Sequence, residues 1–392
     1  MHAPHFAAPG DTQSGAETAI TLTSGVLRAR IDRADWPLDA LCDFAARDNP
    51  RRAFLVVSRL LGRHIPARPS TMRASVRDLA AQLPADLPGP VLVVGLAETA
   101  ICLGQSVHES YRALTGRDDV AFLHSTRQLL DHPLLCRFEE PHSHASTHLI
   151  YRPLWDEALT RSFRSLVLVD DEVSTGTTLA NLAAALAAEL PALETIRVAT
   201  LADWSGSTVW LDRMPHPAAC ASLLSGKLAW EAGTPLPPET APDNFDRAAL
   251  ALGTMERHHN FGRLGRTDIA GDADHLADEL DLPPASRIRV VATGEFTYPP
   301  FRFAERLEAL GHDVVVQSTT RSPARIDGAI RSRLRFGDNY GTAVPNHIYN
   351  VDLADPRLTI ICHETPAGSV DPALVAALDA MTIDFGGGAC SS

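Results

Sequence analysis

The residues best suited to chemistry lie in residues 166–179, which have the sequence LVLVDDEVSTGTTL. The apolar residues predict a buried strand that ends at Asp170 and Asp171, and the small hydroxyl residues after them predict a loop entering a helix. Such a loop presents backbone N–H groups and the positive end of the helix dipole. The sequence therefore predicts a site for a phosphate monoester, formed by Ser174, Thr175, Gly176, Thr177 and Thr178.

Two acidic side chains border this loop. The carboxylates of Asp170 and Asp171 can accept hydrogen bonds from sugar hydroxyls or hold Mg²⁺. An alternative interpretation is a plain strand–turn–helix in which Ser174 or Thr175 only caps the helix. The combination of an apolar strand, paired aspartates and STGTT favours the ligand site, and it matches neither a Walker A loop nor a GxGxxG motif.

The segment resembles the signature that binds phosphoribosyl pyrophosphate (PRPP) in type I phosphoribosyltransferases. In that family the acidic pair contacts the ribose hydroxyls of PRPP, and the following loop holds the 5′-phosphate. The resemblance assigns the first role to Asp170 and Asp171 and the second to residues 174–178. It also implies a pyrophosphate loop at a second strand end, with PRPP as co-substrate and Mg²⁺ as cofactor, held by the same two aspartates.

Residues 91–100, VLVVGLAETA, have the pattern expected of that pyrophosphate loop, which is a strand, a short turn and a helix. The backbone N–H groups of Gly95, Leu96 and Ala97 would bind the pyrophosphate. Glu98 would repel it unless Mg²⁺ or a cationic substrate group lies between them. Alternatively, Glu98 is a carboxylate at a helix N-terminus that the helix dipole favours, and the sequence leaves both interpretations open.

Residues 124–152 are polar and rich in histidine, and so long a stretch predicts an active-site lid. Arg127 and Arg152 are candidates for pyrophosphate contacts, and Glu140, with Glu139, is suited to orient a nitrogen base or to help bind Mg²⁺. Three lid histidines have a spacing that no helix or strand explains, and zinc would need further ligands. Metal binding is therefore disfavoured for His142, His144 and His148.

Residues 53–66, AFLVVSRLLGRHIP, change abruptly from apolar to basic. The simpler interpretation is a buried strand or helix with a solvated end. The alternative is that Arg63 and His64 contact the acceptor or a phosphate group.

Several segments together resemble the orotate phosphoribosyltransferase-like proteins of bacterial tellurium-resistance-associated gene clusters. They are FLVVSRLLGRHIP, VVGLAETA, HSTR, FEEPHSHA and LVLVDDEVSTGTT. In that family a second domain follows the transferase and is named after a Thr-Arg-Ser-Pro (TRSP) motif, which residues 320–323 carry here. The neighbouring ATGEFTYPPF and FGDNYGTAVPNHIYN also fit that domain, so the resemblance covers roughly residues 20–385.

Polar residues of this second part follow predicted strands. Open α/β sheets bind ligands at the carboxyl ends of their strands, and an arginine among hydroxyl groups suits a phosphate or a carboxylate. The alternative is a set of tight turns stiffened by prolines. The candidate ligand residues are Gly294, Glu295, Thr320, Arg321 and Ser322.

The elements that must position these residues alternate along the chain. In the first part, strands are expected at 91–95, 120–124, 166–170 and 195–202, with helices at 98–114 and 178–190. In the second part, strands are expected at 288–293, 313–317 and 358–362, with helices at 301–310 and 371–381. The alternation predicts an α/β fold, with a type I phosphoribosyltransferase-like parallel sheet flanked by helices and a second, smaller α/β (TRSP) domain.

A shift in composition marks the expected division of the chain. Residues 231–244, EAGTPLPPETAPDN, hold four prolines in a polar stretch and predict a linker. The transferase domain is then expected at 21–230 after a disordered leader at 1–20, and the TRSP domain at 245–392.

Composition excludes several classes of protein. The formal net charge of −13 argues against a nucleic-acid-binding surface, and no run approaches the ~18–20 apolar residues of a membrane span. The N-terminus has no basic region followed by an apolar core, so no signal peptide is expected. The six scattered cysteines argue against a disulfide framework and favour the cytoplasm.

Two functions follow from these features. The first is an Mg²⁺-dependent phosphoribosyltransferase that uses PRPP and a base-like acceptor to make a nucleotide-like product, in a tellurium-resistance or stress setting implied by the resemblance. The second is a PRPP- or nucleotide-sensing regulator with a non-catalytic transferase fold. The identity of the acceptor is open, and so is a homodimer.

Overall fold

The structure is a computed structural model of the 392-residue chain. It describes residues 15, 17–47, 52–140, 147–234, 260–269, 273–342, 344–386 and 389–391. Residues 235–244 of the expected linker, most of the expected leader, and the lid residues His142 and His144 lie outside the described residues. Strand β1 begins at Glu17 and strand β11 ends at Ala232, so regular structure enters both the expected leader and the expected linker.

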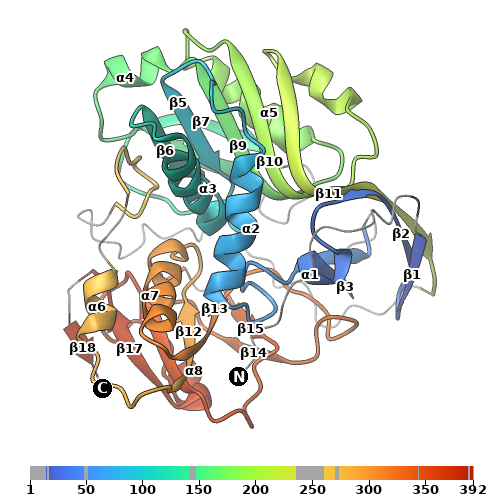
Figure 1. Ribbon diagram of the computed structural model, residues 1–392. Helices are drawn as coiled ribbons and strands as arrows, with labels where there is room; N and C mark the ends of the chain where they lie inside the picture. The colour runs from blue at the N-terminus through green and yellow to red at the C-terminus, as the bar shows by residue number, and fades with distance from the viewer. Residues whose placement is uncertain are drawn as a thin grey trace.

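The larger sheet has seven strands in the order β1-β2-β11-β10-β9-β5-β6 (Figure 1). The strands from β11 to β6 run parallel, whereas β1 and β2 are antiparallel to their neighbours. Parallel strands covered on both faces need near-continuous apolar runs, and VLVVG and LVLV supply them. The strands are β1 (Glu17–Leu22), β2 (Gly25–Ala34), β5 (Val91–Gly95), β6 (Val120–His124), β9 (Ser165–Val173), β10 (Thr195–Asp203) and β11 (Ala218–Ala232).

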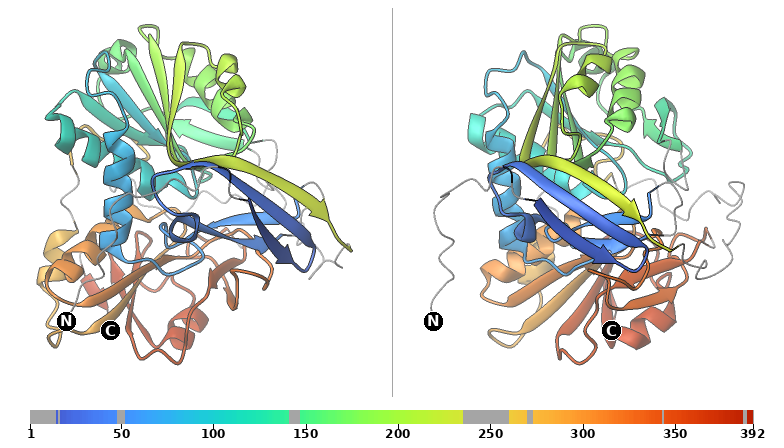
Figure 2. Two further views of the ribbon diagram at one scale, coloured as in Figure 1. Left: turned by 45° about the vertical axis from the view of Figure 1, so that its right-hand side comes forward. Right: turned by 90° about the vertical axis from the view of Figure 1, so that its right-hand side faces the viewer.

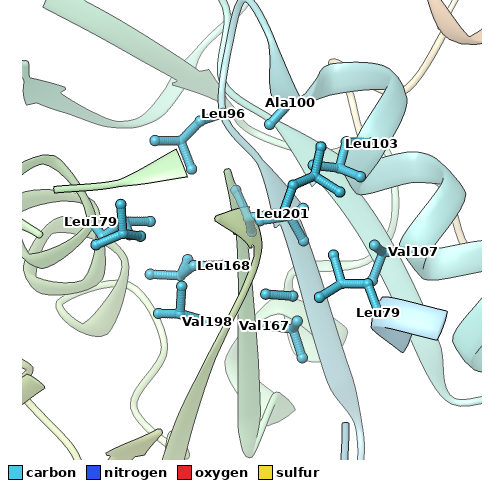
Figure 3. Packing of buried hydrophobic residues seen from close by; sticks show 14 of the residues in the cluster. Leu79, Leu96, Ala100, Leu103, Val107, Val167, Leu168, Leu179, Val198 and Leu201 are labelled. Atoms are coloured by element: carbon cyan, nitrogen blue, oxygen red, sulfur yellow. The ribbon is translucent and has the colours of Figure 1, made fainter. Parts of the chain in front are cut away.

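Helices cover both faces of the parallel strands, with α2 and α3 on one face and α5 on the other (Figure 1). Successive side chains of β9 point to opposite faces, as strand geometry requires. Val167 points toward Leu79 of α2, whereas Leu168 points toward the α5 residue Leu179 (Figure 3). The helices of this part are α1 (Leu38–Leu41), α2 (Pro69–Ala81), α3 (Ala100–Thr115), α4 (Glu157–Ser162), α5 (Thr177–Ala187) and the 3₁₀-helix η1 (Val209–Arg213).

Two hairpins accompany the larger sheet, β3 (Cys42–Ala46) with β4 (Phe54–Ser58), and β7 (Leu134–Glu139) with β8 (Thr147–Tyr151). The second hairpin lies in the stretch that we expected to be a long lid without regular structure, so that expectation is wrong for the described part. Leu135 and Phe138 are buried along β7 and pack into the main core.

The second sheet has the order β13-β12-β16-β17-β18 and is parallel except at β18. The predicted helix at 371–381 is too long, because Asp379 adopts a left-handed conformation that ends it and strand β17 follows. The elements are β12 (Arg287–Ala292), β13 (Asp313–Ser318), β14 (Arg333–Phe336), β15 (Asn346–Tyr349), β16 (Leu358–His363), β17 (Ala380–Asp384), β18 (Ala389–Ser391), α6 (Asp274–Asp278), α7 (Tyr298–Ala309) and α8 (Pro372–Leu378).

The two sheets are held together by a continuous contact between their helices. Helix α7 of the second sheet packs against α2 and α3 of the first (Figure 1). Met72 of α2 and Cys102 of α3 belong to the same buried cluster as Tyr298 and Phe301 of α7. Strands β1, β2 and the end of β11 project to one side as an antiparallel extension (Figure 2).

Among the described residues, no helix has the length and apolar character needed to cross a membrane.

Candidate functional site

The loop between β9 and α5 has the form predicted for a phosphate cradle. Ser174 and Thr175 are exposed, and α5 begins directly after Gly176. Gly176 has a φ of +68°, and a Cβ atom added there would lie 2.3 Å from the ring of Trp210. Both the backbone conformation and the close approach of Trp210 therefore require glycine at this position. The first N–H groups of α5 face the loop without intrahelical acceptors.

An arginine that the sequence did not reveal lies on this loop. The Arg213 guanidinium, from η1, donates to Thr177 Oγ1 at 3.2 Å and also to the Thr175 carbonyl oxygen. Arg213 is exposed, so its charge is available to an anion bound at the loop. No local motif marks this residue, because it comes from a 3₁₀-helix that follows the next strand of the sheet.

The acidic pair lies at the carboxyl end of β9, as expected. Burial, and after it the charge of Asp171, raise the pKa of Asp170 well above its usual value. The described residues include no group of three His, Cys, Asp or Glu side chains that could hold a metal ion by themselves. Mg²⁺ commonly binds through one or two carboxylates together with substrate oxygens and water. Two adjacent, half-buried carboxylates of this kind fit such an ion, because a cation relieves the repulsion between them.

The second loop, between β5 and α3, lies beside the acidic pair. Thr99 Oγ1 donates to Asp171 Oδ1 at 2.9 Å, which ties this loop to the end of β9. A Cβ atom on Gly95 would lie 2.6 Å from the Ala100 carbonyl oxygen, so glycine allows the chain to turn tightly into α3. The peptide bond between Ala97 and Glu98 is cis.

The amide donors of this loop differ from those that we predicted. Leu96 N–H donates to the Val169 carbonyl oxygen at 3.1 Å, and Ala97 N–H donates to Ser125 Oγ at 2.9 Å. Within the described residues, the next two amides, of Glu98 and Thr99, donate no hydrogen bond. They are therefore better placed than Leu96 and Ala97 to bind an anion here.

Glu98 is buried between the two sheets. Its carboxylate accepts from Arg63 Nη2 at 2.8 Å and from Thr320 Oγ1 at 3.1 Å. Burial by itself raises the pKa of Glu98, but the charges of Arg63, Arg127 and Arg321 outweigh it and hold the pKa below its usual value. Glu98 is thus an ionised carboxylate whose charge the protein itself compensates.

Arg63 and His64 do not line an open acceptor site. The second terminal nitrogen of Arg63, Nη1, donates to the carbonyl oxygens of Thr319 at 2.9 Å and Gly294 at 3.2 Å. His64 is buried with its ring centroid 5.3 Å from that of Tyr349, and burial, with the charge of Arg63, lowers the pKa of His64 to about 3. The abrupt basic end of the apolar segment is a contact between the two sheets.

Arg127, Glu140 and His148 form one partly buried network at the β7–β8 hairpin. Glu140 Oε2 lies 2.6 Å from Arg127 Nη2 and 3.0 Å from His148 Nε2. Ser125 Oγ accepts from Ala97 N–H and lies 3.1 Å from His148 Nδ1, and Arg127 Nη2 lies 3.2 Å from His148 Nε2. Burial raises the pKa of Glu140, but the His148 hydrogen bond and the Arg127 charge lower it overall.

Arg152 is not brought to the site. It lies 3.9 Å from Glu189, near the carboxyl end of α5, whereas the phosphate loop is at the other end of that helix. The side chain of Glu139 is also directed elsewhere, since it accepts from Thr147 Oγ1 at 2.8 Å across the hairpin.

The candidate ligand residues of the second part lie close together, and some of them also contact residues of the first part. Gly294 N–H donates to Thr319 Oγ1 at 2.8 Å, and Ser322 N–H donates to Thr320 Oγ1 at 3.1 Å. Glu295 accepts from the hydroxyl of Thr126 and from the N–H of Arg127, the latter at 2.8 Å. A buried bidentate pair that the sequence did not reveal, Arg263 with Glu364 at 2.8 Å, lies among these loops and also holds Tyr340.

A parallel sheet whose strand ends carry an aspartate pair, a hydroxyl loop and a second glycine turn has the type I phosphoribosyltransferase fold. Residues 41–227 match the family model "Phosphoribosyl transferase", and residues 258–378 match the model "TRSP domain C terminus to PRTase_2". Together these matches span most of the chain, which is a phosphoribosyltransferase whose transferase domain is followed by a TRSP domain. The search of curated proteins finds no match.

Some solved structures are similar to the first part of the chain, at low scores. Adenine phosphoribosyltransferase from Rhodothermus marinus is 15% identical with a TM-score of 0.32, and the match covers 48% of this chain and 94% of that chain. Orotate phosphoribosyltransferase from Aeropyrum pernix is 17% identical with a TM-score of 0.27. That match covers 46% of this chain and 84% of that chain. Identities and scores this low assign no acceptor to the present chain.

Proposed function

We propose that the chain transfers the phosphoribosyl group of PRPP to a nitrogen atom of a base-like acceptor, in a reaction that depends on Mg²⁺. The observation that carries the proposal is the junction of two ligand loops at one sheet edge. The phosphate loop and the 96–99 loop are joined there through the acidic pair, by the 2.9 Å hydrogen bond from Thr99 to Asp171. Two adjacent anion loops with an acidic pair between them suit a ribose with a 5′-phosphate at one end and pyrophosphate at C1.

Each group then has a role in binding PRPP. Residues 174–178 and Arg213 bind the 5′-phosphate, and Asp170 and Asp171 accept hydrogen bonds from the ribose hydroxyls. The amides of Glu98 and Thr99 bind the pyrophosphate. Asp170 and Asp171 are the residues that would hold Mg²⁺, which when bound supplies positive charge against the pyrophosphate.

In the reaction, the bond between C1 of the ribose and the pyrophosphate oxygen breaks, and its electron pair leaves with pyrophosphate. The lone pair of the acceptor nitrogen forms the new bond to C1, and the nitrogen loses its proton to water. Positioning and charge stabilisation suffice for this chemistry, so no covalent nucleophile is needed. Glu140, with its lowered pKa, is a poor proton donor and is suited to orient an acceptor N–H.

The finer points of this proposal rest on the sequence resemblance alone. On that ground we propose that the product is a nucleotide-like metabolite of a tellurium-resistance or stress pathway, made in the cytoplasm.

The test is PRPP-dependent release of pyrophosphate by the full chain with Mg²⁺ and a panel of nitrogenous bases, together with PRPP binding by calorimetry. The D170N/D171N double variant should lose PRPP binding. The control is Asp118→Asn, because Asp118 is exposed just before β6, at the other end of the sheet. Unchanged affinity in the double variant would refute the loop assignment, and binding without turnover with any base or cell extract would favour a sensor.

A further inference from the structure

We propose that the C-terminal domain completes the transferase site and that Arg321, from its TRSP motif, binds the pyrophosphate group of PRPP. The inference rests on the proposed function, because it assigns a residue to the same ligand.

The carboxyl-end loops of the two sheets contact each other directly. Thr320, after β13, donates to Glu98, after β5, at 3.1 Å. Glu295, after β12, accepts from Thr126 and Arg127, after β6. The loops that would hold a ligand in either sheet therefore share one boundary.

The carboxylates of the second sheet are already occupied by the protein. Glu295 is 5% exposed and holds the Thr126–Arg127 backbone, and Glu364 is 6% exposed and holds Arg263. A separate ligand site built on these two carboxylates would have to break buried hydrogen bonds. The contacts fit a domain that positions the transferase loops, with Glu295 and Thr320 as positioning residues.

Arg321 is set at this boundary by the backbone around it. It lies in a tight turn that the 3.1 Å hydrogen bond from Ser322 N–H to Thr320 Oγ1 closes, and Thr320 itself contacts Glu98. Its positive charge acts on Glu98, which is one residue from the Thr99 hydroxyl that holds Asp171. The guanidinium is half-buried, and it makes no hydrogen bond or ion pair to a described residue.

The neighbouring arginines are engaged, in contrast. Arg63 is committed to Glu98 and to two carbonyl oxygens, and Arg127 is paired with Glu140. Arg321 interacts with Glu98 through its charge, but its N–H donors are not used by a described residue, so they are available to a bound anion.

Pyrophosphate is the anion that this position suits. In the 96–99 loop, the N–H groups of Leu96 and Ala97 already donate hydrogen bonds to other residues of the protein. The loop also carries the negative charge of Glu98. A highly charged leaving group needs a cation there beyond the two remaining amides. A guanidinium can donate two parallel hydrogen bonds to phosphate oxygens, and its charge would stabilise pyrophosphate as it departs.

The experiment is calorimetric binding of PRPP, inorganic pyrophosphate and ribose 5-phosphate to the full chain with Mg²⁺. Arg321→Gln should weaken PRPP and pyrophosphate by about 10- to 100-fold, the usual effect of losing a hydrogen bond to a charged group, and leave ribose 5-phosphate unchanged. Arg331→Gln is the matched control, because Arg331 is an exposed arginine of the same domain. If Arg321→Gln fails to fold, Arg321→Lys should show the same selective loss, smaller in size.

Wild-type affinity for pyrophosphate in the folded Arg321 variant would overturn the inference and leave the proposed function standing. Equal losses for pyrophosphate and ribose 5-phosphate would also overturn it, since they would indicate general damage to the site. A wild-type protein that binds neither PRPP nor pyrophosphate would instead refute the proposed function.

Discussion

Substitutions in the Arg63–Glu98 ion pair give the most direct test of how the two sheets are joined, because this pair links the candidate pyrophosphate loop to the second sheet. The side chains of Arg63 and Glu98 are 4% and 14% exposed, respectively. Arg63 also donates hydrogen bonds to two carbonyl oxygens of the second part. Arg63→Met keeps most of the side-chain volume but leaves a buried carboxylate and two buried carbonyls without their donor. Breaking a buried pair from one side usually costs about 3–5 kcal/mol, so we expect a loss of that order in the free energy of unfolding.

The pH dependence separates the two parts of this loss. In the wild-type protein the pKa of Glu98 is below its usual value, so the pair contributes stability above the unfolded-state pKa and loses it as pH falls through the folded-state pKa. In Arg63→Met the Glu98 pKa must rise relative to wild type, because burial remains and the largest opposing charge is gone. The penalty of the substitution should therefore shrink as pH falls from the raised Glu98 pKa of the variant toward the lowered Glu98 pKa of the wild-type protein. About 1.5–3 kcal/mol should remain for the carbonyls.

Urea unfolding followed by tryptophan fluorescence, at several pH values, measures both quantities. The single variant Glu98→Gln and the double variant Arg63→Met/Glu98→Gln complete a double-mutant cycle, in which the double variant should be more stable than Arg63→Met alone at neutral pH. A penalty below about 1 kcal/mol, or one that stays constant down to pH 3, would refute the reasoning, since the pair would then not be a buried ion pair.

Two further predictions concern the phosphate loop. Gly176→Ala should weaken ribose 5-phosphate binding by at least tenfold, because the left-handed backbone costs about 1–2 kcal/mol for alanine and its methyl group meets Trp210; unchanged binding in calorimetry would show that the loop is not the phosphate site. Arg213→Gln should weaken ribose 5-phosphate by about 3- to 10-fold and leave pyrophosphate unchanged, since an exposed arginine contributes modestly. Arg161→Gln, an exposed arginine on α4, is its control, and equal affinities in both variants would remove Arg213 from the site.

Much of the fold follows from local sequence. The runs VLVVG and LVLVD predict β5 and β9 because strands covered on both faces must be apolar throughout. The β7–β8 hairpin was missed because its pattern is irregular. The buried residues Leu135 and Phe138 are three positions apart, which breaks the strand period of two, and the register of the hairpin shifts between Leu134 and Cys136. The polar and histidine-rich residues around it also favoured an irregular loop.

The candidate site could be predicted only where it is local. Asp170 and Asp171 lie near the end of β9 and residues 174–178 follow that strand, so topology alone places them together. Glu98 could not be interpreted from its neighbours, because the groups that compensate its charge are separated from it by 35 and 222 positions, Arg63 and Thr320. Such contacts depend on how the two sheets dock, which propensity and periodicity do not encode. In this chain the carboxylate of Glu98 is compensated by Arg63 of the first part and, across the docked sheets, by the Thr320 hydroxyl and the charge of Arg321 from the second domain.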